Sequence, residues 1–266
     1  MREIPVRAWI WYIENLRVVN DKAASLVRKY LEKNGVPQTR AAMDKLIDYA
    51  YSVSTKYGEA SATLAAEMYD KIAKLSNVAV PQAIPAPVPD IHEVAKAVVG
   101  TAKTGNEEII SSAVGRLVKQ TGVDTTMQNA LRDGAEWAWI PHGDTCAFCI
   151  ALASRGWQKA SKQAIKNGHA EHIHANCDCT YAVRFDRSMN VEGYDPDKYL
   201  DMYDSAVTYE EDGEIVTDIW AKHKEKINAL RRDFYEDNKE EINAQKRSAY
   251  AKRRERESSR AEEIDV

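Results

Sequence analysis

Hydrophobic residues recur every three or four positions through the first part of the chain. Residues 6–34 carry one such stripe, which places the apolar side chains on one face of a helix. Two further stripes predict helices over residues 39–57 and 59–75, with Gly58 as the break between them. Each stripe needs a partner to be buried. We therefore expect an antiparallel helical subdomain over residues 1–76.

The next stretch, residues 77–90, is rich in proline. Proline removes backbone donors and favours an extended, semi-rigid chain. We place a domain boundary here and interpret the stretch as a linker. The alternative is a segment that packs across a single fold. The prolines are Pro81, Pro85, Pro87 and Pro89.

Helical and strand patterns then alternate over residues 91–186. Residues 91–121 predict two helices, the second capped by Asn106, and a further helix follows Asp124. Aromatic residues over 136–142 predict a strand, and residues 180–185 predict another.

Residues 149–166 predict a helix, a break at Gly156 and a second short helix. The expected fold class is α+β and predominantly helical. Its α+β domain over residues 91–186 would hold a short sheet with helices around it.

The last two segments differ in charge. Residues 187–220 are acidic and predict a connector with one short helix, whereas residues 221–266 form a basic helical tail. Ile227-Asn228-Ala229 recurs fifteen positions later as Ile242-Asn243-Ala244, so the repeated residues return to nearly the same helix face. The tail is either an exposed charged helix or a helix that lies along phosphates, including those of DNA. The candidate nucleic-acid contacts are Arg231, Arg232, Lys246, Arg247, Arg253 and Arg254.

Overall composition excludes several classes of protein. The formal net charge is −4, so the chain as a whole lacks the signature of a nucleic-acid-binding protein. No apolar run is long enough for a transmembrane helix, and Arg7 and Glu14 interrupt any signal-peptide core. We expect a protein with no membrane partner, made in the host cytoplasm.

All four cysteines lie between residues 144 and 179. Cys146 and Cys149 form a C-x-x-C pair, and after a gap of about 25 residues the chain continues as H-x-H-x-x-C-x-C. Two such clusters can hold one tetrahedral metal, and sulfur with imidazole favours zinc. The candidate ligands are Cys146, Cys149, Cys177, and either His174 or Cys179. Because no secretory signal is present, metal binding is favoured over disulfide pairing.

A closed site with four protein ligands is structural, and we assign no catalytic residue and expect no enzyme. Two catalytic interpretations compete with the structural one. His169-Ala170-Glu171 matches the H-x-E of zinc deaminases, but the C-x-x-C then lies on the wrong side of it. His172 and His174 alternate as on one face of a strand and could belong to a nuclease-type zinc enzyme. A DNA-binding module carried by the tail alone is the remaining alternative.

The sequence resembles tailed-bacteriophage minor head proteins, the head-morphogenesis proteins related to the Mu-type minor head family. The resemblance rests on residues 132–146 and 168–186, which carry the pattern C-x-x-C followed by H-x-x-C-x-C, and is firmest over residues 91–186. It implies a minor capsid protein of the virion that works with portal or capsid proteins during head assembly, DNA packaging or DNA delivery.

Overall fold

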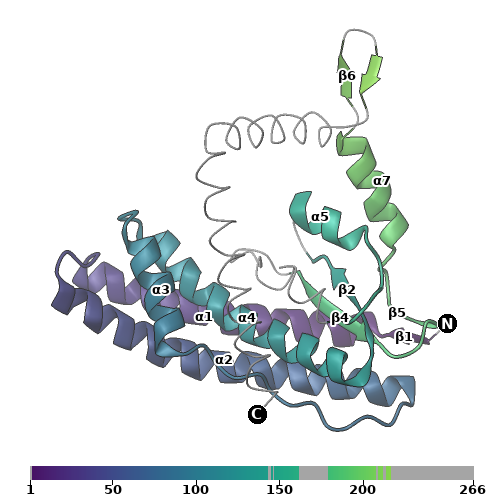
Figure 1. Cartoon of the computed structure of the whole chain (residues 1–266), viewed down its shortest axis with the longest axis horizontal. Helices are drawn as coiled ribbons and strands as arrows, with labels where there is room; N and C mark the ends of the chain where they lie inside the picture. The colour runs from purple at the N-terminus through teal and green to yellow at the C-terminus, as the bar shows by residue number, and fades with distance from the viewer. Residues whose placement is uncertain are drawn as a thin grey trace, which may run out of the picture. The chain divides into compact units, whose positions relative to one another are not determined.

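A computed structural model describes residues 2–142, 145, 147–161, 179–207, 209–211 and 214–216. The chain divides into two compact units, Met1–Tyr203 and Asp204–Val266. Most of the described residues belong to the first unit, which combines long helices with small sheets (Figure 1). The predicted α+β, predominantly helical fold class is confirmed.

Four helices form the body of the first unit. They are α1 (Val6–Asn34), α2 (Arg40–Ser76), α3 (Ile91–Ala102) and α4 (Glu107–Asp133). The predicted first helix and the cap of α4 are confirmed. The Asn106 side chain accepts hydrogen bonds from two backbone N–H groups of the first turn, at 2.8 and 3.3 Å.

Two predicted helix breaks are wrong. Helix α2 runs without interruption through Gly58, and α4 runs through Gly122 and Asp124. Both glycines lie where another segment approaches closely. A Cβ on Gly58 would stand 3.1 Å from Cγ1 of Val88, and a Cβ on Gly122 would stand 2.6 Å from Oγ of Ser61. These glycines therefore permit close packing and do not end a helix.

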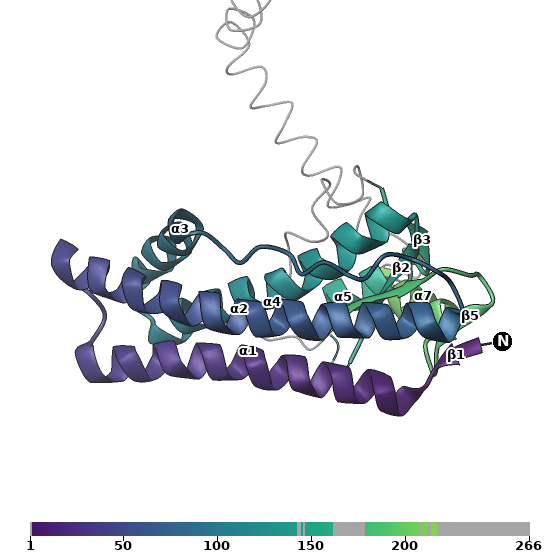
Figure 2. The same cartoon turned by 90° about the horizontal axis from the view of Figure 1, so that it is seen from below.

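The proline-rich segment packs across the unit and does not separate two domains. Figure 2 shows it running back along α2 to the start of α3. Side chains of α2 and α4 bind its backbone, and α2 and α4 pack directly on each other. The predicted division at residues 77–90 thus differs from the structure, in which residues 1–203 form one compact unit. The proline-rich segment therefore matches the alternative interpretation, in which it packs across a single fold.

A three-stranded antiparallel sheet in the order β3-β2-β4 packs against the helices (Figure 1). It contains β2 (Glu136–Ile140), β3 (Gln158–Lys159) and β4 (Thr180–Arg184), so the two longer strands confirm the prediction. A short helix was predicted between Gly156 and residue 166. The structure has strand β3 there instead, and residues 162–166 lie outside the described residues.

The N-terminus forms a second small sheet that the sequence did not predict. Strand β1 (Arg2–Ile4) pairs in parallel with β5 (Met189–Val191). The Ile4 side chain is fully buried, and the Glu192 carboxylate accepts a 2.7 Å hydrogen bond from the Val6 N–H at the start of α1. The first part of the predicted acidic connector is therefore built into the first unit.

The remaining described elements follow β5. They are α7 (Pro196–Val207), which matches the short helix predicted in the acidic segment, and the hairpin of β6 (Tyr209–Glu211) and β7 (Glu214–Val216). The predicted basic tail lies outside the described residues. Within the described part of the chain, no helix combines the length and the apolar character needed to span a membrane.

Candidate metal centre

The described residues of the cysteine motif lie beside the β3-β2-β4 sheet. Strands β2 and β4 are antiparallel, with Ile140 opposite Thr180. Cys146 follows Ile140 by six residues, and Cys179 directly precedes Thr180. The pairing register therefore places Cys179, at the start of β4, beside the end of β2, from which the chain leads to the C-x-x-C pair.

Cys149 lies in the short helix α5 (Ala147–Ala153), which packs against β2. Its side chain is only 1% exposed. The end of α5 is fixed by Tyr194, whose hydroxyl donates a 2.7 Å hydrogen bond to the Ala153 carbonyl. The position of this thiol is thus set by the packing of α5 on the sheet.

Cys179 is completely buried at the start of β4. Its Sγ accepts a hydrogen bond from the backbone N–H of His142 at 3.4 Å, whereas the contact in which the thiol would donate to the His142 carbonyl is longer, at 4.0 Å. An N–H donor stabilises the thiolate form, which is the form that binds metals. The local geometry therefore suits Cys179 as a ligand.

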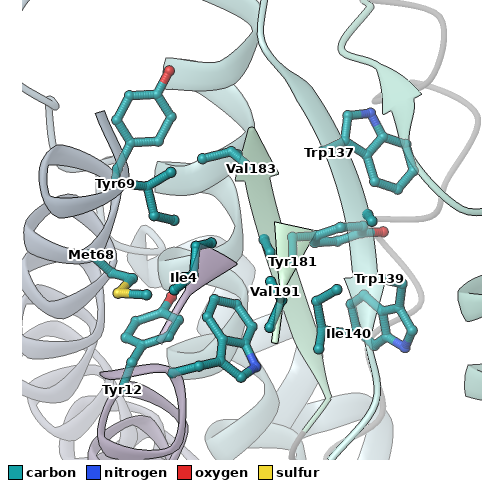
Figure 3. Packing of buried hydrophobic residues seen from close by; sticks show 14 of the residues in the cluster. Ile4, Tyr12, Met68, Tyr69, Trp137, Trp139, Ile140, Tyr181, Val183 and Val191 are labelled. Carbon is teal, nitrogen blue, oxygen red and sulfur yellow. The ribbon is translucent and has the colours of Figure 1, made fainter. Parts of the chain in front are cut away.

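Aromatic residues of the two long strands pack close to these cysteines. The Tyr181 ring lies between Trp137 and Trp139, with ring centroids 4.8 and 4.6 Å apart and edge-to-face geometry (Figure 3). All three side chains are buried, in the same hydrophobic cluster as both cysteines. Burial raises the pKa of Tyr181, as expected of a phenol in low-dielectric surroundings. The sheet thus presents a rigid, water-poor wall beside the thiols.

A family model described as VG15 protein matches residues 3–206. The chain belongs to this family. It is a family of viral gene products, consistent with a phage protein. No curated protein and no solved structure matches the chain.

The match to the VG15 family covers nearly all of the first unit, including both halves of the cysteine motif. It ends at residue 206, close to the boundary of the compact unit at Tyr203. Sheet, helices and cysteines thus belong to the part of the chain that defines the family.

The end of the sheet away from the cysteines is held by charged side chains. The Glu136 carboxylate pairs with Arg184 at 2.7 Å and with Arg187 at 3.4 Å. The Arg184 guanidinium also lies 4.7 Å from the centre of the Trp157 ring. This cluster fixes β2 to β4 at one end, and Cys179 lies at the other.

The structure describes only part of the predicted site. Cys149 and Cys179 are placed, whereas Cys146, His174 and Cys177 lie outside the described residues, as do His169 and His172. Among the residues that are described, no three His, Cys, Asp or Glu side chains cluster as metal ligands do. The zinc site therefore stays a prediction. The six basic tail residues also lie outside the described residues: Arg231, Arg232, Lys246, Arg247, Arg253 and Arg254.

Sequence reasoning missed one participant, the backbone of His142. Its role depends on the N–H group, which every residue except proline carries, so residue identity gives no signal. Only the strand register shows that this N–H meets the Cys179 sulfur.

Proposed function

We propose that the chain is a minor head protein of a tailed phage, acting near the portal, and that a structural zinc ion closes the cysteine end of its sheet. The family match supports a phage protein. The observation that carries the zinc proposal is that Cys149 and Cys179, one from each motif half, are both buried in the hydrophobic cluster around β2 and β4. The proposed role is assembly and not catalysis.

The donor set fits zinc on chemical grounds. Cys149 and Cys179 are buried thiols, and Cys146 and Cys177 are three and two residues away from them in the chain. Such short spans limit the separation of Cα atoms within each pair to about 7–11 Å. When bound, zinc would supply a tetrahedral cross-link between the two halves.

The fourth ligand is Cys179 in our proposal, with His174 as the alternative. The hydrogen bond from the His142 N–H to the Cys179 sulfur supports this choice, because such a donor stabilises the thiolate that binds a metal. A cysteine at this position would give the site four thiolates.

Metal analysis of the whole protein, purified under reducing conditions without chelator, tests the site. We expect one zinc per chain, lost in Cys149→Ser and Cys179→Ser and kept in His174→Asn. His92→Asn is the matched control, because His92 is an exposed imidazole on α3, outside the motif. Zinc binding to such sites is worth on the order of 10 kcal/mol, so a chelator should increase hydrogen exchange in β2 and β4.

Several results would contradict the zinc proposal. Protein without stoichiometric zinc would exclude it, and so would native disulfides among the four cysteines. Loss of zinc in His174→Asn with retention in Cys179→Ser would assign the fourth ligand to His174 instead.

The head role is tested separately. Quantitative mass spectrometry of purified virions and immature heads should find the chain at a fixed copy number relative to the portal protein. Its absence from both particles would refute the head role while leaving the zinc site untouched.

A further inference from the structure

The segment from Pro81 to Pro89 has the periodicity of a polyproline II helix. Within it, Ala83, Ala86 and Pro89 are buried, and the residues between them are exposed or half-buried. Burial at every third position is expected of a helix with three residues per turn, and the prolines favour that conformation. One edge of this helix therefore faces α2 and α4.

Side chains of the two helices hold the backbone of this segment in place. Asn129 binds Ile84 twice, accepting from its N–H and donating to its carbonyl, each at 2.9 Å. Arg132 reaches two carbonyls near the start of the segment and is itself paired with Asp133 at 2.7 Å. The remaining clamps are Asp70 on the Ala83 N–H at 2.8 Å and Thr125 on the Ala86 N–H at 2.9 Å.

These contacts fix the segment before any partner arrives. An extended peptide loses conformational entropy when it binds, and pre-organisation removes that cost. The clamps do not engage every carbonyl of the segment. The carbonyls of Pro85, Ala86 and Pro87 accept no hydrogen bond within the described part of the chain.

The outward edge of the segment is apolar. Pro81, Ile84 and Pro87 follow one another at intervals of three and are all exposed. Ile84 is 65% exposed, more than any other large hydrophobic side chain that the structure describes. Together these residues form an apolar ridge, defined here as Pro81, Ile84 and Pro87, on a rigid backbone.

We infer that this ridge docks into an aromatic-lined groove of another protein. Polyproline II segments are recognised by grooves in which aromatic rings pack on the prolines, and Trp and Tyr donors can bind the free carbonyls. Residues 81–89 carry no charge, which argues against a nucleic acid as the partner. The occupant is therefore a folded protein with exposed Trp, Tyr or Phe side chains.

Photo-crosslinking during phage assembly tests the inference in the full-length protein. Benzoylphenylalanine replaces Gln82, an exposed residue beside the ridge, and in a matched control it replaces Val18, which is 63% exposed on α1. We expect position 82 to crosslink to a partner segment containing at least two aromatic residues. Adding Ile84→Asp should lower that yield at least tenfold, whereas Ile84→Leu should keep it within twofold.

Thermal unfolding of each variant separates binding from folding, because the Ile84 side chain is exposed and its replacement should leave the fold intact. Equal yields for Ile84→Asp and Ile84→Leu would overturn the inference. So would a partner segment without aromatic residues, crosslinks only within the chain, no crosslink at position 82, or the same partner segment from position 18. Crosslinking to an aromatic groove by a chain absent from heads would refute the head role and leave this inference standing.

Discussion

Three glycines inside helices provide a graded test of the packing between α2 and α4. Gly100 of α3 has no atom within 4 Å of the place where a Cβ would stand. At Gly58 the nearest atoms belong to two side chains, Cγ1 of Val88 at 3.1 Å and Oγ1 of Thr121 at 3.3 Å. At Gly122 the nearest atoms are the Ser61 Oγ at 2.6 Å and the Ser61 carbonyl oxygen at 3.3 Å. The same replacement by alanine therefore meets open space at Gly100, a tight side-chain contact at Gly58, and a clash with the side chain and backbone of Ser61 at Gly122.

Two opposing effects, helix propensity and overpacking, set the change in the free energy of unfolding for each glycine-to-alanine replacement. Alanine is favoured over glycine in a helix interior by about 1 kcal/mol. Overpacking in a buried interface costs about 1–3 kcal/mol. We expect Gly100→Ala to stabilise the protein by up to about 1 kcal/mol, Gly58→Ala to be near neutral, and Gly122→Ala to lie about 1–3 kcal/mol below Gly100→Ala.

Denaturant unfolding followed by circular dichroism measures these differences. In a chain of this size, each kcal/mol corresponds to a Tm change of about 2–4 °C. A Gly122→Ala protein as stable as Gly100→Ala would show that α2 and α4 do not pack as closely as described.

Ser61 provides an internal check on the clash at Gly122. Its hydroxyl is buried and makes no hydrogen bond within the described part of the chain. Ser61→Ala alone should therefore be neutral or stabilising. In the double variant it should recover part of the loss, because one of the two crowding atoms is gone. Strict additivity of the two changes would contradict a direct contact.

Other predictions follow from buried contacts. Asn129→Ala should destabilise the protein by about 2–4 kcal/mol in denaturant unfolding, because the backbone of Ile84 loses two hydrogen bonds. Ile84→Ala should change the free energy of unfolding by less than about 0.5 kcal/mol. Equal effects of the two variants would contradict the role of Asn129 as a clamp. Burial raises the pKa of Tyr12 from 10.0 to about 12, so the contribution of its neutral phenol to the free energy of unfolding is complete below pH 10 and is lost as pH rises toward 12. Tyr12→Phe should therefore flatten the fall in unfolding free energy over this pH range. An unchanged slope would contradict the raised pKa. Ile4→Ala should cost about 2–5 kcal/mol because the side chain is fully buried, and a thermal shift below 2 °C would contradict the β1–β5 pairing.

Local sequence signals identified most elements but predicted two helix boundaries that the structure does not have. Asn106 caps α4 as predicted, and the aromatic strand β2 and its partner β4 form where expected. Gly58 was predicted to break a helix, since glycine weakens an isolated helix, and a separate helix was predicted after Asp124. In the structure the missing side chains of Gly58 and Gly122 allow Val88 and Ser61 to approach, and the packing of α2 on α4 compensates for the weaker propensity.

The proline-rich segment shows the same limit. Its composition predicted an extended chain, and the period-three burial of Ala83, Ala86 and Pro89 agrees. Whether it linked two domains or crossed one could not be decided, because its anchors, such as Asn129 and Arg132, come from a helix about 45–50 residues later in the chain. The composition of a segment predicts its backbone conformation, but it does not predict which distant residues the segment contacts.

The sequence by itself determined the helix stripes, the caps, the two long strands and the spacing of four cysteines, because each depends on residues a few positions apart. Tertiary structure alone decided that β1 pairs with β5, that α2 and α4 continue through their glycines, and that the start of β4 lies beside the end of β2. These contacts join distant residues, and their energy comes from packing and hydrogen bonds that form only when the segments meet.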